Sequence, residues 1–121
     1  MKLINDFFNI IDSESADGVY KCKVKLNANH HLYNVHFPGN PITPGVCLLQ
    51  MATEILEQYY GNNLLLQKAG SIKFKKIIIP TVQPTFVFSK TAIEDGCLKT
   101  VVMIEDEENQ FVKMSLTYSI L

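Results

Sequence analysis

Several stretches of the chain alternate apolar and polar residues, which is the pattern of a strand with one buried face. In the first, lysines fill the polar positions of the run Tyr20, Lys21, Cys22, Lys23, Val24, Lys25 and Leu26. Similar runs occupy residues 72–75, 85–88, 98–104 and 112–120, and a Glu94-Asp95-Gly96 turn signal precedes the third of these. We expect an antiparallel meander in the second half of the chain, and a lysine row that faces water in the first strand.

Residues 43–60 have the pattern of a buried helix. Thr43 is placed to cap it, Pro44 suits its first position, and Gly61 can end it. The apolar residues cover most of its circumference instead of one stripe: Val46, Cys47, Leu48, Leu49, Met51, Ala52, Ile55 and Leu56. A helix of this kind lies inside a domain, so other elements must wrap around it.

The order of elements predicts one α+β domain over residues 1–121. A helical stretch is expected at residues 4–11, and a long loop at residues 27–43 separates the first strand from the buried helix. Loops of this length in small domains tend to carry function. A strongly curved antiparallel sheet around the hydrophobic helix would bury both, although a flatter helix-on-sheet sandwich has the same periodicity.

The charge balance gives no sign of a nucleic-acid or membrane partner. Eleven basic and 12 acidic residues leave a formal charge of −1, and no apolar run approaches the length of a bilayer span. We expect a cytoplasmic protein. The widely separated Cys22, Cys47 and Cys97 indicate buried free thiols without a metal site, and a low-pKa thiolate at Cys47 is the alternative.

Candidate chemistry is concentrated in the segment that leads into the buried helix. It reads His36-Phe37-Pro38-Gly39-Asn40-Pro41-Ile42-Thr43-Pro44-Gly45-Val46. Three prolines fix the backbone and so present His36 at a defined position. Gly45 falls near the second helical position, where the amide lacks an intrahelical partner and can polarise a thioester carbonyl. A nearby histidine could then take the α-proton.

This segment resembles the active-site motif of the 3-hydroxyacyl-acyl carrier protein dehydratases, which are hot-dog proteins. The resemblance continues through residues 72–76 and through Ile79-Pro80. It implies that His36 is the catalytic histidine and Gly45 the oxyanion donor, in a fold whose curved sheet surrounds the helix. The residues that it implies for substrate contact are Phe37, Pro38, Gly39, Pro44 and Val46.

The resemblance also implies the assembly and the partner. Members of this family form dimers or trimers of dimers, with the acyl chain in a tunnel at the dimer interface. Their substrate is carried on the phosphopantetheine of an acyl carrier protein, and no other cofactor is implied. Lys73, Lys75 and Lys76 resemble the basic segment that docks the carrier, although strand alternation also explains Lys73 and Lys75.

The sequence departs from the family at the acid on the helix. Gln50 stands where the family has glutamate or aspartate, and Glu54 stands one turn later, where the family often has glutamine. A carboxamide has no titratable proton near neutral pH, so Gln50 can orient a hydroxyl or a water but cannot act as the acid. Glu54 is either a substitute catalytic acid or a partner for Gln50. A second departure is Val35, which replaces a glycine before the histidine.

The leading hypothesis is a lyase that dehydrates 3-hydroxyacyl thioesters to trans-2-enoyl thioesters. His36 would abstract the α-proton, Gly45 would polarise the carbonyl, and Gln50 or Glu54 would assist at the hydroxyl. One alternative is a hot-dog thioesterase in which Gln50 holds the attacking water. Another is a catalytically impaired carrier-binding subunit, which would pair with a homologous subunit that retains its acid.

Overall fold

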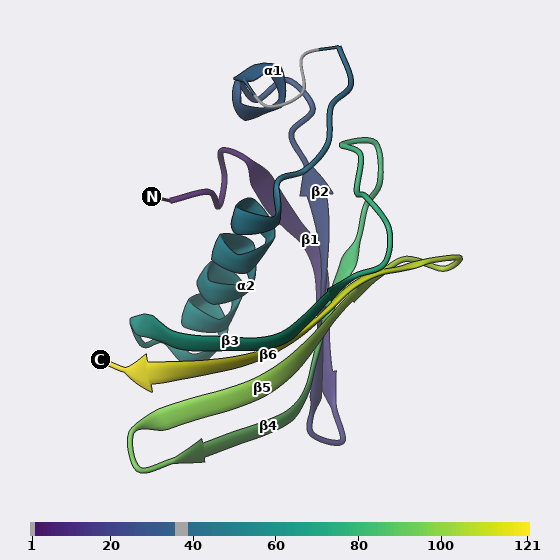
Figure 1. The fold of residues 1–121 in the computed structure, drawn as a ribbon. Coiled ribbons are helices and arrows are strands. Elements are labelled where there is room, and N and C mark those ends of the chain that lie inside the picture. The colour runs from purple at the N-terminus through teal and green to yellow at the C-terminus, as the bar shows by residue number, and fades with distance from the viewer. Residues whose placement is uncertain (1, 36–38) are drawn as a thin grey trace.

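The structure is a computed structural model that describes residues 2–35 and 39–121. Its elements are β1 (Phe8–Ala16), β2 (Val19–Leu26), α1 (Leu32–Val35), α2 (Gly45–Tyr60), β3 (Leu64–Phe74), β4 (Thr85–Glu94), β5 (Cys97–Glu105) and β6 (Gln110–Ile120) (Figure 1). The strands form one antiparallel sheet in the order β1-β2-β4-β5-β6-β3. The α+β class and the four strands after the long helix are confirmed.

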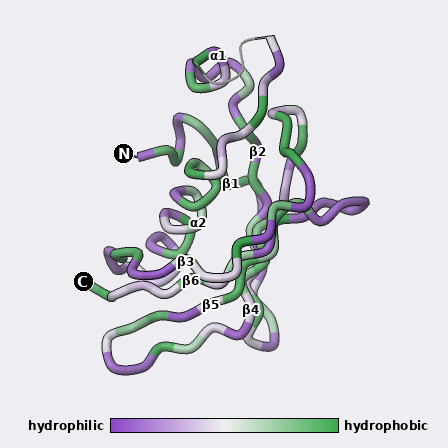
Figure 2. Tube along the Cα trace, in the orientation of Figure 1, coloured by the Kyte–Doolittle hydropathy of each residue, from purple (hydrophilic) through white to green (hydrophobic). Residues whose placement is uncertain are grey.

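Helix α2 lies in the bend of the twisted sheet (Figure 1). Its buried face includes Met51 and Ile55, and β6 supplies Tyr118 from the opposite side of the core; all three are 0% exposed. The alternating strands place their polar residues outward, and Lys21, Lys23 and Lys25 are exposed as predicted. Figure 2 shows the hydrophilic tip where β5 connects to β6. The predicted curved sheet around one hydrophobic helix is confirmed.

The two ends of α2 differ from each other in how well the sequence predicts them. Gly61 follows the last turn with a φ of 72°, and its N–H donates to Glu57 O, so the predicted stop is confirmed. The predicted Thr43 cap is wrong, because Pro44 occupies the N-cap in an extended conformation and makes no side-chain cap hydrogen bond. The Thr43 hydroxyl instead hydrogen-bonds the Tyr33 hydroxyl at 2.9 Å.

The predicted N-terminal helix at residues 4–11 is wrong. The chain makes one turn, in which the Asp6 and Phe7 amides donate to Leu3 O, and then enters β1 at Phe8. Most of β1 is exposed because it is the edge strand, so its residues do not alternate in polarity. The alternation of apolar and polar residues, which predicts a half-buried strand, is therefore missing in β1.

Two tight hairpins set the register of neighbouring strands in the sheet. Asp95 and Gly96 have φ values of 52° and 74°, which joins β4 to β5 at the predicted turn. Asp17 and Gly18 have nearly the same conformation, 52° and 77°, and join β1 to β2. The Asp-Gly pair at residues 17–18 was therefore the available signal for β1.

Strand β3 also extends beyond its prediction. It begins at Leu64, eight residues before the alternating run at 72–75, and it forms the other edge of the sheet. Ile72 packs against the hydrophobic core, whereas Phe74 is 61% exposed. The reason is positional: Phe74 ends the strand beside the start of α2, where it covers Gly45.

Candidate functional site

Aromatic packing fixes the loop before α2 to the N-terminal turn. Phe7 is fully buried and stacks on Tyr33 with ring centroids 5.1 Å apart and an interplanar angle of 20°. Tyr33 in turn reaches across to Thr43 through its hydroxyl. Burial raises the pKa of Tyr33 to about 12, and the hydrogen bond from Thr43 offsets this only in part. The described residues on both sides of the histidine motif are therefore tied together.

His30 is a second anchor of this loop. Its Nδ1 accepts the Leu32 N–H at 3.1 Å, so in the neutral ring Nε2 carries the proton and donates to Asp6 Oδ2 at 3.1 Å. The edge of Phe7 packs against the same ring at 5.1 Å between centroids. His30 is buried, and it joins the loop to the N-terminal turn.

The motif residues His36, Phe37 and Pro38 lie outside the described residues, so their roles remain predictions. The structure describes the residues on either side of them. Val35 is 66% exposed at the end of α1, and Gly39 follows with a φ of 79°, a backbone conformation that favours glycine. Gly39 and Val46 are both exposed, and Pro44 is half-buried.

Gly45 is the first residue of α2, whereas it was predicted near the second helical position. Its amide belongs to the first turn of the helix. The Cys47 and Leu48 N–H groups both donate to Pro44 O, whereas the described residues offer no acceptor for the Gly45 N–H. A Cβ at this position would lie 2.9 Å from Phe74 Cζ and 3.2 Å from Cε1. Glycine therefore leaves room for the Phe74 ring at the helix start.

A cavity of about 360 Å³ opens beside this amide. Its walls are mainly apolar, and they come from the segment before α2, from α2 itself, and from the end of β3 and the residues that follow: Ile42, Pro44, Gly45, Leu48, Phe74 and Ile77. Such a lining suits an acyl or pantetheine chain that enters along the helix N-terminus. Pro44 and Gly45 therefore line the cavity, whereas Gly39 and Val46 do not.

Two of the three candidate docking lysines line the same cavity. Lys75 Nζ donates to Gln110 Oε1 at 3.1 Å, and Lys76 Nζ donates to Asn109 Oδ1 at 2.9 Å, so neutral partners orient both ammonium groups. Lys73 does not line the cavity and pairs with Lys113 in the strand register. The basic segment therefore contributes two cations to the cavity wall.

Gln50 and Glu54 contact each other on α2. Gln50 Nε2 donates to Glu54 Oε2 at 2.8 Å. Glu54 is 4% exposed, and its two oxygens also accept the Leu3 N–H, at 2.9 Å each, while Oε1 accepts the Ile4 N–H at 2.7 Å. Of the two interpretations of Glu54, the structure shows the partner for Gln50, and it adds the N-terminal amides that the sequence could not reveal.

The cysteines near the site are packed thiols. Cys47 is 2% exposed and burial raises its pKa, so the alternative of a low-pKa thiolate at the helix start is wrong. Burial also raises the pKa of Cys22 to about 11. Both side chains belong to the core, although the helix start alone would have favoured a thiolate at Cys47.

Alkylation should therefore follow exposure. At mildly alkaline pH, iodoacetamide is expected to modify the partly exposed Cys97 well before Cys22 and Cys47, because the thiolate is the reacting species and burial disfavours it. Peptide mass spectrometry of timed samples would show the order. Rapid modification of Cys47 in the folded protein would contradict the burial seen here, and a sample unfolded in urea is the control in which all three react.

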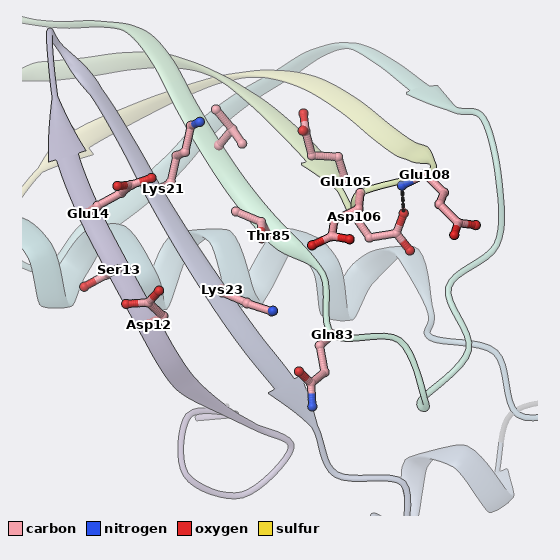
Figure 3. A pocket seen from close by; sticks show the side chains of 12 residues that line it. Asp12, Ser13, Glu14, Lys21, Lys23, Gln83, Thr85, Glu105, Asp106 and Glu108 are labelled. Atoms are coloured by element: carbon pink, nitrogen blue, oxygen red, sulfur yellow. Dashed lines mark hydrogen bonds between the residues drawn. The ribbon is translucent and has the colours of Figure 1, made fainter.

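A larger open groove of about 540 Å³ lies on the outer side of β1 and β2, away from these residues (Figure 3). Its wall carries both charges, from Glu14, Lys21 and Lys23 on the two strands and from Glu105 and Asp106 at the end of β5. None of the candidate site residues that the structure describes lines it. The groove at the sheet surface is thus separate from the cavity at Gly45.

Within residues 2–35 and 39–121, we find no helix long and apolar enough to cross a membrane. The same residues contain no group of three or more His, Cys, Asp or Glu side chains that could hold a metal ion. Of the described candidate residues, Gly45 lines the cavity, whereas the hydrogen-bonded Gln50 and Glu54 do not.

Comparison with known proteins identifies the family. The model of the ApeI-like family, described as ApeI dehydratase, matches residues 12–114. The 3-hydroxyacyl-acyl-carrier-protein dehydratase FabZ of Lactobacillus helveticus is 31% identical over 110 residues, which cover 84% of this chain and 74% of that protein. The predicted resemblance to the dehydratases is thereby confirmed.

Solved structures share the fold. The dehydratase heterocomplex ApeI:P from Xenorhabdus doucetiae aligns with a TM-score of 0.67 at 14% identity, over 91% of this chain and 96% of that one. A thioesterase from Haemophilus influenzae aligns with a TM-score of 0.64 at 11% identity, over 94% and 78%. The fold is the hot-dog, and because the family model covers most of the sequence, this chain belongs to the ApeI-like dehydratase family.

Proposed function

We propose that this chain eliminates water from a 3-hydroxyacyl thioester carried on an acyl carrier protein, giving the trans-2-enoyl thioester. The observation that carries the proposal is the Gly45 amide, which begins α2 beside an apolar cavity and has no acceptor among the described residues. A thioester carbonyl placed there accepts this N–H at the positive end of the helix dipole. The charge that develops on the carbonyl oxygen when the α-proton leaves is stabilised at the same point.

The proton transfers follow from the motif. The imidazole of His36 takes the C2 proton, the C2–C3 double bond forms, and the C3–O bond breaks as the hydroxyl leaves with a proton to become water. Gln50 orients that hydroxyl but has no proton to give. In a chain acting alone, the His36 imidazolium is the acid that completes the water. In a shared site, a carboxyl group of the other subunit takes this role.

The cavity and its lysines indicate how the substrate arrives. The apolar walls fit an acyl chain or pantetheine arm, and Lys75 and Lys76 are placed to attract the acidic surface of a carrier protein. We assign Phe37, Pro38, Gly39, Pro44 and Val46 to the substrate-binding surface by their place in the motif. Lys73 is the weakest of the docking residues, since it does not line the cavity.

We also propose a cytoplasmic dimer or trimer of dimers in which each site is completed by the neighbouring subunit. Strand β3 ends the sheet, and its Leu65 and Phe74 side chains are 52% and 61% exposed. Ile77, which follows the strand, is 58% exposed. An edge strand with apolar side chains is suited to pair with another chain.

A second candidate is a carrier-binding subunit that works with a homologous partner. The observation that favours it is Glu54, whose two oxygens are engaged by the Leu3 and Ile4 amides and by Gln50, so it is not placed to serve as a substitute acid. A partner subunit with its own acid would complete the site with His36 from this chain. The named heterocomplex among the structural neighbours supports such an assembly.

Mass spectrometry of a 3-hydroxyacyl carrier protein incubated with the purified chain tests the proposal. Loss of one water from the acyl group is the expected result, with the chain alone or after mixing with a co-encoded homologue. Activity only in the mixture identifies the partner-subunit version. Free acid and free carrier thiol without an enoyl product would instead identify a thioesterase, and no change under either condition rejects the dehydratase proposal.

A further inference from the structure

The turn between β5 and β6 is attached to the basic segment that follows β3. The Lys75 and Lys76 N–H groups donate to Phe111 O at 2.7 and 3.2 Å, so backbone hydrogen bonds fix this segment to the start of β6. Both lysine side chains are exposed, and both line the cavity at Gly45. The turn is therefore joined to one wall of the proposed substrate cavity.

The acceptors that hold Lys75 and Lys76, the lysine pair, are carboxamides and not carboxylates. Lys75 Nζ donates to Gln110 Oε1 at 3.1 Å, and Lys76 Nζ donates to Asn109 Oδ1 at 2.9 Å. A carboxamide oxygen accepts a hydrogen bond without carrying a formal charge, and an ammonium group has two further donors to offer. In the part of the chain that the structure describes, no carboxylate lies within ion-pair distance of either lysine. Each lysine is thus oriented while its positive charge stays available.

The acidic residues of the turn do not neutralise the lysine pair. Asp106 Oδ1 accepts the Glu108 N–H at 2.9 Å and the Asn109 N–H at 2.7 Å, which closes the turn on itself. The Glu108 amide, with smaller contributions from Asn109 and Lys76, holds the pKa of the Asp106 carboxyl below its usual range. The Asp106 carboxylate is therefore committed to the backbone of its own turn.

We propose that the β5–β6 turn is a docking element for the carrier protein, in which Asn109 and Gln110 are positioning residues that present the lysine pair to carboxylates on the carrier surface. The carrier as partner rests on the proposed function, and the presentation of the lysines rests on their contacts with the two carboxamides. Cations that have no carboxylate partner of their own suit a partner surface that carries negative charge.

The charges of the turn also restrict how the carrier can sit. Glu107 and Glu108 are exposed at the hydrophilic tip of the hairpin (Figure 2). Exposed charges act over a screening length of about 8 Å at physiological ionic strength. The lysine pair attracts carboxylates of the carrier, whereas the tip repels them, so the acidic surface of the carrier is favoured on the lysine side. A pantetheine arm that leaves the carrier there starts beside the cavity at Gly45.

Association kinetics test the role of the carboxamides without any need for dehydration. Gln110→Glu replaces a neutral acceptor with a carboxylate of nearly the same shape, which pairs with Lys75 and cancels its charge. Surface plasmon resonance on an immobilised carrier protein that bears a 3-hydroxybutyryl group is the measurement. At low ionic strength, the association rate constant is expected to fall about fivefold and the dissociation rate constant to change less than about twofold. High salt should remove the difference.

Two further variants separate the charge from other effects. Gln110→Ala removes the acceptor without adding a charge, and it should lower the association rate only about twofold, since surface hydrogen bonds of this kind are weak. Gln58→Glu is the matched control, because it adds the same charge at an exposed position about 20 Å along α2 from Gly45. Its association rate should equal that of the wild-type chain. An equal loss in Gln58→Glu and Gln110→Glu, or a folded Gln110→Glu chain that associates like the wild type, would overturn the proposal.

Smaller thioesters distinguish the carrier surface from the phosphate of the pantetheine arm. Calorimetry should give the same affinity for 3-hydroxybutyryl-coenzyme A in the wild-type and Gln110→Glu chains. A loss with this thioester, but not with 3-hydroxybutyryl-pantetheine, would assign the lysine pair to the phosphate and overturn carrier docking. Association that depends on Gln110 while the acyl group loses no water supports docking and rejects the proposed dehydration alone. Dehydration by a wild-type chain whose association with the carrier is independent of salt rejects docking alone.

Discussion

Exchanging the acid and the amide on α2, in the double variant Gln50→Glu with Glu54→Gln, is expected to raise the kcat of dehydration about 10²-fold, the lower range of a positioned general acid. The exchange places a carboxyl group where the resembled dehydratases have one. It also preserves the hydrogen bonds: the introduced carboxamide donates to the introduced carboxylate, and its oxygen accepts the Leu3 and Ile4 N–H groups that Glu54 now accepts. Rates of enoyl formation on a 3-hydroxyacyl carrier protein would measure the gain.

The single variant Gln50→Glu separates the effect of the new acid from that of the hydrogen-bond pattern. It places two carboxylates at a contact that now measures 2.8 Å, where one must bind a proton or move away. We expect a smaller gain in kcat and a lower melting temperature than in the double variant. A double variant no faster than an active wild-type chain would show that position 50 is not where an acid acts.

The fold was predictable wherever a strand or helix has a buried side. The exposed lysines of β2 and the buried Met51 and Ile55 of α2 were predicted from their patterns, whereas Val46, another apolar residue of α2, is 64% exposed. Edge strand β1 was missed because its exposed residues carry no alternation, although Asp17-Gly18 marked its hairpin. Thr43 has the composition of a cap, and only the packing of Tyr33 reveals that its hydroxyl is used elsewhere.

The candidate site, like the fold, was predictable from sequence only where local patterns mark it. Gly45 was found because prolines, a helix start and a glycine lie together in sequence, and the structure adds the ring of Phe74 above it and the cavity beside it. The contacts of Glu54 with Leu3 and Ile4 join residues 51 and 50 positions apart. No local pattern predicts such a contact, which arises from how the N-terminal turn packs on α2.

These long-range contacts change how Gln50 and Glu54 on α2 are interpreted. Taken alone, Gln50 suggested a lost acid and Glu54 suggested a displaced one. With the carboxylate committed to the N-terminal turn, the proposed site has an amide for the carbonyl and a carboxamide for the hydroxyl, and its proton chemistry falls to His36 or to a second subunit. The dehydratase and partner-subunit hypotheses therefore differ in where the acid comes from, and both require His36.

Replacing His36 with alanine is accordingly expected to lower kcat about 10²- to 10⁴-fold in whichever assembly proves active, the range for loss of a general base. An imidazole base must be neutral to accept the α-proton, so the rate of the native assembly should fall toward acid pH. The residual rate of His36→Ala should lose that acid limb. Enoyl formation measured across pH, with KM determined at each point, checks both effects.

His31→Ala is the matched control, because His31 is an exposed histidine of the same loop that stacks on the ring of His30 at 4.4 Å. It should keep the native rate and the acid limb. Carrier binding should survive His36→Ala, since the cavity at Gly45 and its two lysines are unchanged. Equal rates in His36→Ala and the native assembly would place the proton abstraction outside this chain, and would leave it only the binding role.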